Sequence, residues 1–253
     1  MPRANRHFLP GYVWHITHRC HKKEFLLKFA RDRRRWMTWL YEARKRYDLC
    51  VLNYVATSNH IHLLVHDRGR GEIARGMQLV AGRTGQEYNQ RKGRRGAYWE
   101  DRYHATAVDA ESYLTRCLVY IDLNMVRAGV VSHPMYWEAG GFREIQNPPA
   151  RYWILDLDAL KALLGIKTVP ELQRVRRQWV DEALRAGRVA REGVWSESLA
   201  VGREAFVETV KAKLGVSGRY RRIHTRDDGV YSLKEPAAVV YRVDFDLRKA
   251  GLS

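Results

Sequence analysis

The chain of 253 residues is predicted to fold as an α+β protein in which helices cover one face of a mainly antiparallel sheet. Two observations predict this class. Segments with strand and helix periodicity follow one another in the order strand, helix, strand, strand, helix, strand, helix. A short polar turn joins the two central strands, which makes them an antiparallel hairpin. We expect the sheet face without helices to stay open for a ligand.

The first four elements are expected before residue 67. Residues 11–18 (GYVWHITH) are rich in β-branched and aromatic side chains and predict a strand. Residues 30–47 predict a helix, because apolar side chains recur at helical spacing and leave the arginines on the opposite face. Residues 49–56 and 60–66 predict two strands, joined by a turn at Thr57-Ser58-Asn59. The apolar helix positions are Trp36, Trp39, Leu40, Ala43 and Tyr47.

The next three elements complete the pattern. Residues 70–90 return to helical spacing, and residues 97–108 (AYWEDRYHATAV) predict a strand. Asp109 is placed to cap the N-terminus of a helix that continues to about Ala128 and ends at Gly129. These elements make up a catalytic or binding domain that we place at residues 1–147.

A second unit, residues 148–253, is predicted to be a mainly helical extension. Its start is marked by the helix-breaking run Asn147-Pro148-Pro149, and helical stretches follow near 156–165, 169–187 and 201–214. Two β-rich runs near the C-terminus, VYSL and AVVYRVDF, are candidates for a terminal hairpin. The pattern leaves three roles open for this extension: it can extend a binding surface, cover a site or mediate association.

Composition excludes several classes of protein. Mean hydropathy is −0.49, and no apolar run approaches the roughly 20 residues that span a bilayer, so we expect no membrane association. The first residues, MPRANRHFLPGYVW, lack the apolar stretch of a signal peptide, which predicts a cytoplasmic protein. The three cysteines are far apart and odd in number, so reduced thiols are expected rather than disulfides or a Cys-based zinc site.

The positive charge is unevenly distributed along the chain. The formal net charge is +17, of which residues 1–100 carry +13, residues 101–150 carry −2 and residues 151–253 carry +6. A basic first part beside a near-neutral segment suggests a track for a polyanion that stops short of different chemistry. Nucleic acid is therefore the favoured partner, with basic faces kept for solubility as the alternative.

Two histidines carry the first sign of chemistry. In the motif NHIHLLV, His60 and His62 are two residues apart in a predicted strand, so their imidazoles project from the same face. Two imidazoles can bind one divalent metal ion, but a catalytic site usually needs a third protein ligand. On its own the pair is weak evidence for a metal site and is better explained by surface or packing residues.

The predicted helix that contains YLTRCLVYIDLNMVRAGVV supplies further groups. Leu114, Leu118, Ile121 and Met125 form its buried stripe, and Tyr120, Asn124 and Arg127 follow one another on an adjoining face. If this helix packs against the histidine strand, the Asn124 carboxamide becomes the third metal ligand and the Tyr120 hydroxyl faces the metal-bound group. The alternative for Tyr120 is an ordinary aromatic side chain at the edge of the core.

At these residues the chain resembles the HUH single-tyrosine transposases, and most closely the REP-associated tyrosine transposases. The resemblance rests on LPGYVWHITHRC, NHIHLLV, WEDRYH and YIDLNMVRAGVV, and it extends from Pro10 to about Val131. It departs from the usual family motifs at Thr57-Ser58, Asp101 and Met125, none of which removes a proposed chemical group. Asp122 stands two residues from the tyrosine and is expected to face away from it.

The resemblance implies a ferredoxin-like antiparallel sheet, the HUH endonuclease fold, and an enzyme that cuts and rejoins single-stranded DNA. It implies that Tyr120 forms a covalent 5′-phosphotyrosine and that His60, His62 and Asn124 hold one Mg²⁺ or Mn²⁺ ion. It also implies hairpin-flanked DNA sites as the target, a cytoplasmic, nucleoid-associated enzyme, and either a monomer or a homodimer.

Further residues are predicted to contact the DNA. Arg102, Tyr103 and Arg127 are candidates for gripping the backbone or a base, and Trp99 is a candidate stacking platform with core packing as the alternative. The predicted phosphate track consists of Arg31, Arg34, Arg35, Arg91, Arg94 and Arg95.

Two rival functions remain at this stage. The first is a non-catalytic nucleic-acid-binding regulator on the same fold, which would need neither the histidine pair nor the tyrosine. The second is a zinc hydrolase that uses the histidines, against which the missing third His or Cys and the missing HExxH motif count.

Overall fold

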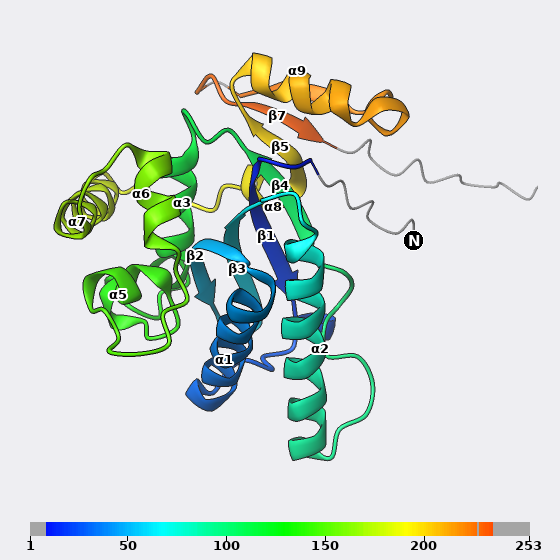
Figure 1. The fold of residues 1–253 in the computed structure, drawn as a ribbon, viewed down its shortest axis with the longest axis vertical. Helices are drawn as coiled ribbons and strands as arrows, with labels where there is room; N and C mark the ends of the chain where they lie inside the picture. Colours follow the sequence, from blue (N-terminus) through cyan, green and yellow to red (C-terminus); the bar gives the residue numbers. More distant parts are fainter. Residues whose placement is uncertain (1–8, 227, 235–253) are drawn as a thin grey trace, which may run out of the picture.

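The computed structural model describes residues 9–226 and 228–234. Its first part has the element order βαββαβ, in which both helices pack beside each other in front of the sheet (Figure 1). The predicted ferredoxin-like fold is thereby confirmed for this part. Its elements are β1 (Val13–Arg19), α1 (Ala30–Tyr47), β2 (Cys50–Ala56), β3 (His60–His66), α2 (Glu72–Lys92) and β4 (His104–Val108), with a short 3-10 turn, η1 (His21–Lys23), after β1.

Strand register decides which side chains share a face. The strand β1 lies between β3 and β4 and is antiparallel to both, and Thr17 pairs with His62 while His15 pairs with Leu64. Side chains of paired residues lie on the same face, so His15 and His62 are diagonal neighbours. Leu63 and its partner Tyr54 lie on the other face, where the Tyr54 ring packs 6.1 Å from that of Trp36 in α1. The imidazoles therefore lie on the face opposite α1 and α2.

That opposite face is covered, so the expectation of an open sheet face is wrong. The helix α3 (Leu114–Asp122) packs on β2, and the short helix α8 (Val194–Glu197), which comes from the extension, packs on β1 and β4. The apolar stripe of α3 is buried as predicted, and the Trp195 ring of α8 is fully buried. A pattern of helices along the chain does not reveal that α8 returns to this face.

Two predicted boundaries shift in the structure. The strand predicted over 97–108 is confined to β4, because the segment before it makes only a bridge from Trp99 to Cys20 and then bends. The helix predicted from Asp109 to Ala128 is interrupted at Leu123, giving α3 and the single turn α4 (Asn124–Arg127). Asp109 does not cap it: its buried carboxylate accepts a hydrogen bond from Nε of Arg203 at 2.8 Å.

The extension contains strands as well as helices, and it continues the same sheet. The strand β5 pairs in parallel with β4, and the described residues form one sheet in the order β2-β3-β1-β4-β5-β7-β6. The hairpin β6–β7 includes most of the VYSL run, whereas AVVYRVDF lies outside the described residues. The remaining elements are η2 (Pro134–Tyr136), α5 (Gly141–Gln146), α6 (Leu157–Leu164), α7 (Val169–Arg185), β5 (Ser198–Gly202), α9 (Glu204–Lys213), η3 (Gly215–Gly218), β6 (Arg222–Thr225) and β7 (Tyr231–Lys234).

Because the sheet and the main hydrophobic core run through both parts, the extension is packed on the first part throughout; α9 lies over β5 and β7 at one end (Figure 1). The boundary near residue 148 stays a prediction. Within the part of the chain that the structure describes, no helix is both long and apolar enough to cross a membrane.

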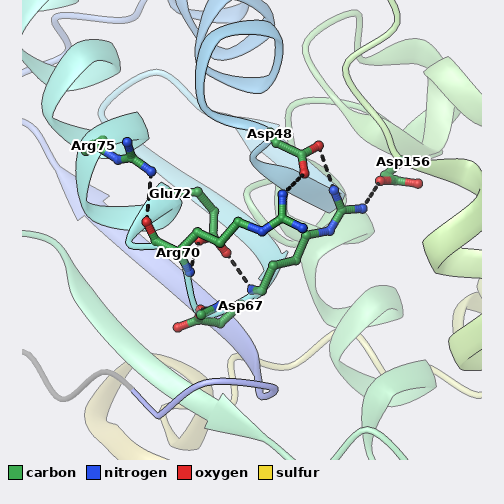
Figure 2. Close-up of polar contacts among 8 residues, drawn as sticks. Asp48, Asp67, Arg70, Glu72, Arg75 and Asp156 are labelled. Atoms are coloured by element: carbon green, nitrogen blue, oxygen red, sulfur yellow. Dashed lines mark hydrogen bonds and ion pairs between the residues drawn. The ribbon is translucent and has the colours of Figure 1, made fainter.

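One set of ion pairs between the first part of the chain and the extension involves the loop after β3. The Arg68 guanidinium pairs with Asp48 at 2.6 Å and with Asp156 at 2.7 Å. Figure 2 shows the Asp48 carboxylate, at the end of α1, in contact with two arginine side chains, one of which also contacts Asp156 at the start of α6. Asp156 also caps α6, because its other carboxylate oxygen accepts from the Ala159 N–H at 3.0 Å. This contact holds the beginning of the extension against the first helix.

A second contact between the two parts is a buried ion pair on the face of the sheet that carries the imidazoles. Asp122 at the end of α3 accepts from Arg176 of α7 at 2.6 Å, with both side chains essentially removed from solvent. Its other oxygen accepts from the Asn53 amide at 2.8 Å. As expected, Asp122 faces away from Tyr120. Burial raises the pKa of Asp122 and lowers that of Arg176, and their mutual attraction opposes both shifts.

The buried pair gives a stability prediction. Replacing Asp122 by alanine leaves the Arg176 charge buried without its partner, and we expect this to lower the free energy of unfolding by about 3–5 kcal/mol. The double variant Asp122→Leu with Arg176→Met removes both charges and is expected to be clearly more stable than Asp122→Ala. Denaturant unfolding measures the free energy of unfolding of both variants. The control is Arg34→Ala, which removes an exposed ion pair with Glu138 and should change the free energy of unfolding little. A double variant no more stable than the single one would contradict this.

Candidate active site

The two histidines of the NHIHLLV motif lie next to each other on β3, on the face turned toward α3 and α4. Their ring centroids are 5.0 Å apart and the rings are nearly perpendicular. His62 is almost fully buried and His60 is partly buried. The two-residue spacing in a strand therefore brings the imidazoles onto one face as predicted.

Asn124 completes the group. Its side-chain amide lies 2.8 Å from Nε2 of His62, and it also hydrogen-bonds to His60. Asn124 is the first residue of α4, directly after the interruption at Leu123. The break in the helix thus occurs where the carboxamide has to meet the imidazoles.

The Nδ1 side of His60 is held by the turn that precedes the strand. Nδ1 donates to the Asn59 carboxamide oxygen at 2.8 Å, and the Asn59 amide nitrogen in turn donates to the Lys23 carbonyl at 3.2 Å, which sets the orientation of that carboxamide. The Thr57 hydroxyl donates to the His60 carbonyl and accepts from the His60 N–H. With its proton on Nδ1, His60 presents a bare Nε2 to the site.

His62 has a corresponding partner on the neighbouring strand. Its Nδ1 lies 2.9 Å from Nε2 of His15, and Nδ1 of His15 lies 2.8 Å from the Trp195 carbonyl. Burial lowers the pKa of His15 to about 3 and that of His60 to about 4, and it lowers the pKa of His62 well below its ordinary value. All three imidazoles are therefore neutral at pH 7.

Tyr120 lies at the centre of this group. Its ring is 5.9 Å from the His62 ring and 6.1 Å from the His15 ring, both in edge-to-face geometry, and 6.0 Å from the Trp195 ring. The Arg127 guanidinium lies over its face, 4.4 Å from the centroid. Burial raises the pKa of Tyr120, and the positive charge of Arg127 partly opposes that shift. The helix face predicted for Tyr120, Asn124 and Arg127 does meet the histidine strand.

Three arginines give the site a positive potential. Arg19, Arg127 and Arg191 all act on His60, where they add to the lowering of its pKa. Arg127 is fixed by its Nε, which donates to the Val189 carbonyl at 2.9 Å. Arg19 and Arg191 are exposed, and each forms a surface ion pair, Arg19 with Glu100 at 3.9 Å and Arg191 with Glu197 at 3.2 Å.

The donor set fits a divalent metal ion. Within the described residues, no group of three or more His, Cys, Asp or Glu side chains is gathered for a metal, so the third ligand would be Asn124. Both imidazoles direct bare Nε2 atoms at one carboxamide, and the 2.8 Å separation matches the roughly 3 Å between neighbouring ligands of an ion bound at about 2.1 Å. Turning the carboxamide by half a rotation would offer its oxygen, a ligand suited to Mg²⁺ or Mn²⁺.

The predicted phosphate track lies elsewhere. Its arginines belong to α1, α2 and the loop after α2, on the sheet face opposite the imidazoles. Arg31, Arg35 and Arg91 line a cavity of about 210 Å³ between the two helices, where Arg35 pairs with Glu87 and Arg91 with Asp32. Arg34 and Arg94 pair with Glu138 and Glu24, and Arg95 is exposed. The structure does not bring this set together with Tyr120.

The remaining predicted DNA contacts differ in accessibility. Arg102 is exposed, whereas the Tyr103 side chain is only 4% exposed and packs edge-on against His18. The Trp99 ring is stacked on the His18 ring at 4.1 Å, and its Nε1 donates to the Ala81 carbonyl. In this structure Tyr103 and Trp99 are packing residues, whereas Arg127 contacts the Tyr120 ring.

Sequence reasoning missed His15, Trp195 and Arg191. His15 stands in the predicted first strand, but only the register of that strand against β3 shows that it meets His62. Trp195 and Arg191 belong to a segment more than 60 residues beyond Arg127, and no spacing in the sequence relates them to Tyr120.

Comparison with known proteins gives one family match. Residues 10–124 match the family model described as "Transposase IS200 like". A search of curated proteins finds no match. Among solved structures, the chain is similar to a REP-associated tyrosine transposase bound to a REP hairpin, with 15% identity, a TM-score of 0.49 and coverage of 62% of this chain and 94% of the other. It is also similar to a protein from Deinococcus radiodurans R1 described as a transposase, with 12% identity, a TM-score of 0.34 and coverage of 46% and 91%.

The buried histidines predict a pH-dependent stability. Their pKa values are lower in the folded protein than the ordinary 6.5, so the unfolded chain binds more protons between pH 6.5 and about 4. The free energy of unfolding should be constant above pH 7 and fall below pH 6.5, by up to about 1.4 kcal/mol per pH unit for each histidine. Urea unfolding between pH 5 and 8 measures the free energy of unfolding at each pH. The variant His60→Asn should reduce its slope with pH by the contribution of one histidine. A stability that does not change between pH 6.5 and 5 would contradict the assignment.

Proposed function

We propose that the chain is an IS200-like transposase, whose family model matches residues 10–124, and that it cleaves single-stranded DNA with Tyr120 and rejoins it through a covalent phosphotyrosine. The observation that carries the proposal is the meeting of a tyrosine, two neutral imidazoles and a carboxamide in one seam between β3 and α3–α4. A protein that only binds nucleic acid has no use for these groups together, which argues against the regulator.

The proposed step is a transesterification. Oη of Tyr120 loses its proton and attacks the phosphorus of the scissile phosphodiester, the bond from phosphorus to the 3′-oxygen breaks, and that oxygen leaves as a 3′-hydroxyl after taking up a proton. The 5′ side stays attached to the tyrosine. Because the phosphotyrosine is still an ester of phosphate, a 3′-hydroxyl can attack it and rejoin the DNA without an external energy source.

The residues of the chain have distinct tasks in this step. Arg19, Arg127 and Arg191 would hold the non-bridging phosphate oxygens, whose charge grows during the reaction. Arg127 also favours the phenolate, which otherwise forms with difficulty because burial raises the pKa of Tyr120. His60, His62 and Asn124 would hold a Mg²⁺ or Mn²⁺ ion, which supplies Lewis-acid stabilisation of the phosphate when bound.

The DNA partner is proposed from the resemblance and from charge. We propose single-stranded DNA that flanks a hairpin, because REP-associated tyrosine transposases, which the motifs resemble, use such sites. The basic surface of α1 and α2 lies on the far side of the sheet from Tyr120, and its arginines suit the backbone of a duplex stem rather than the scissile strand. The choice between monomer and homodimer, and association with the nucleoid, stay part of the proposal.

The nucleophile can be tested by trapping. Replacing Tyr120 by phenylalanine removes the attacking oxygen, so the covalent adduct with a single-stranded oligonucleotide should fall by at least about 1000-fold. A denaturing gel with a labelled hairpin-flanked oligonucleotide measures the adduct. Tyr136→Phe, at a tyrosine that is 68% exposed, is the control and should leave the yield unchanged. An adduct that survives in Tyr120→Phe would exclude this tyrosine as nucleophile.

Metal dependence is tested separately. Treatment with EDTA should abolish the adduct, and Mg²⁺ or Mn²⁺ should restore it in the wild-type protein. The variant His62→Ala removes one ligand and should raise the Mn²⁺ concentration needed for half-maximal adduct by more than about tenfold. The matched control is His66→Ala, at the far end of the same strand. Full adduct formation in EDTA would contradict the metal site.

A further inference from the structure

A line of hydrogen bonds connects the extension to the proposed metal site. It begins at the Trp195 carbonyl, passes through both ring nitrogens of His15 and both of His62, and ends at the Asn124 carboxamide. Each separation is 2.8 or 2.9 Å, and the four residues Trp195, His15, His62 and Asn124 are all buried. Four parts of the chain that are far apart in sequence, α8, β1, β3 and α4, therefore meet in one polar path through the core.

The direction of every hydrogen bond in this path follows from its first member. A carbonyl oxygen only accepts, so Nδ1 of His15 carries the proton, and Nε2 of a neutral His15 is then an acceptor. His62 must donate to it from Nδ1, which leaves Nε2 of His62 without a proton. A metal-binding imidazole needs a bare nitrogen, and a partner on its other nitrogen usually sets which one is bare.

The carbonyl at the start of the path is itself held in place. The Thr106 hydroxyl of β4 donates to the nearby Ser198 carbonyl at 2.6 Å and lies 3.2 Å from the Trp195 carbonyl, and the Trp195 side chain is fully buried against the Tyr120 ring. Directly after α8 the chain enters β5, which is joined to β4 by strand pairing. The position of the carbonyl is thus set by the packing of the extension on the first part.

We propose that His15 is a positioning residue that keeps Nε2 of His62 bare and directed at Asn124, and that the C-terminal extension sets His15 through the Trp195 carbonyl. The inference rests on the proposed function, in which His62 is a metal ligand. It gives the extension a definite task, because without residues 194–197 nothing on this path would fix the proton of His15 on Nδ1.

The same segment of the extension acts on the nucleophile. The Val189 and Ala190 carbonyls accept hydrogen bonds from Nε of Arg127 at 2.9 and 3.2 Å, and this holds the guanidinium over the Tyr120 ring. Residues 189–195 therefore contact both the group that positions the metal ligand and the group that favours the phenolate. The extension completes the site rather than lying beside it.

The first test reads the proton positions directly. Long-range ¹H–¹⁵N spectra of the metal-free full-length protein at pH 7.5 distinguish the two neutral forms of each imidazole. We expect His15 and His62 both to carry the proton on Nδ1, with the peaks assigned by their loss in His15→Gln and His62→Gln. A proton on Nε2 of either ring would overturn the proposal.

The second test separates positioning from structure. In His15→Phe, His62 loses the acceptor for its Nδ1 proton, so we expect Mn²⁺ affinity to fall by about 10–100-fold and the His62 proton to move to Nε2. In His15→Gln, the carboxamide oxygen can accept from Nδ1 of His62, and we expect both the His62 proton position and Mn²⁺ affinity to return to within about threefold of wild type. The concentration of free Mn²⁺ is measured by electron paramagnetic resonance.

The outcomes distinguish this proposal from the proposed function. Equal Mn²⁺ affinity in His15→Phe and wild type, or an equal loss in His15→Phe and His15→Gln when both are folded, would overturn the role of His15. A wild-type protein that binds no Mn²⁺ would count against the metal site and hence against the proposed function. The proton positions are measured without metal, so they test only the positioning role of His15. His66→Gln is the control for a histidine on the same strand and should match wild type in both measurements.

Discussion

The antiparallel register of β1 against β3 is the constraint on which the site depends. Pairing of Thr17 with His62 and of His15 with Leu64 places two imidazoles diagonally on one face, close enough for a hydrogen bond. A slip by one residue would turn every side chain of one strand to the other face and put an imidazole among the apolar side chains under α1. Ile16 and Leu63, which are fully buried on that face, oppose such a slip, so the core that stabilises the fold also aligns the histidines.

Much of the first part of the chain could be predicted from periodicity, because its elements bury one clear face. The helix α1 and the hairpin β2–β3 begin and end within a few residues of their predicted limits. The His60 and His62 pair and the face of Tyr120 and Asn124 were also accessible, since each depends only on spacing within one element. What could not be predicted depends on contacts between distant segments: His15 needs the strand register, and the cover over the second sheet face needs the return of α8.

The interruption at Leu123 and the turn at Thr57 illustrate how local departures serve the site. The predicted continuous helix treats residues 114–128 as uniform, yet the helix is interrupted at Leu123, directly before the residue whose carboxamide meets the imidazoles. At Thr57, where the family that the motifs resemble usually has methionine, the hydroxyl closes the turn by hydrogen bonds to the His60 backbone. The hydroxyl thereby helps to fix the start of the histidine strand.

The distribution of charge has a physical consequence for how a cation and an anion would affect each other's binding at the site. Most of the basic residues of α1 and α2 lie behind the sheet, and the potential around His60 comes from Arg19, Arg127 and Arg191. The same arginines that lower the pKa of His60 by disfavouring a proton also disfavour a metal cation at that imidazole. A phosphate that pairs with those guanidinium groups cancels their field and adds oxygen ligands of its own, so each anion that enters strengthens the binding of the cation. In the proposed function, the electrostatics of the neutral imidazoles and surrounding arginines would therefore favour joint binding of the metal ion and a phosphate over a site filled by metal alone.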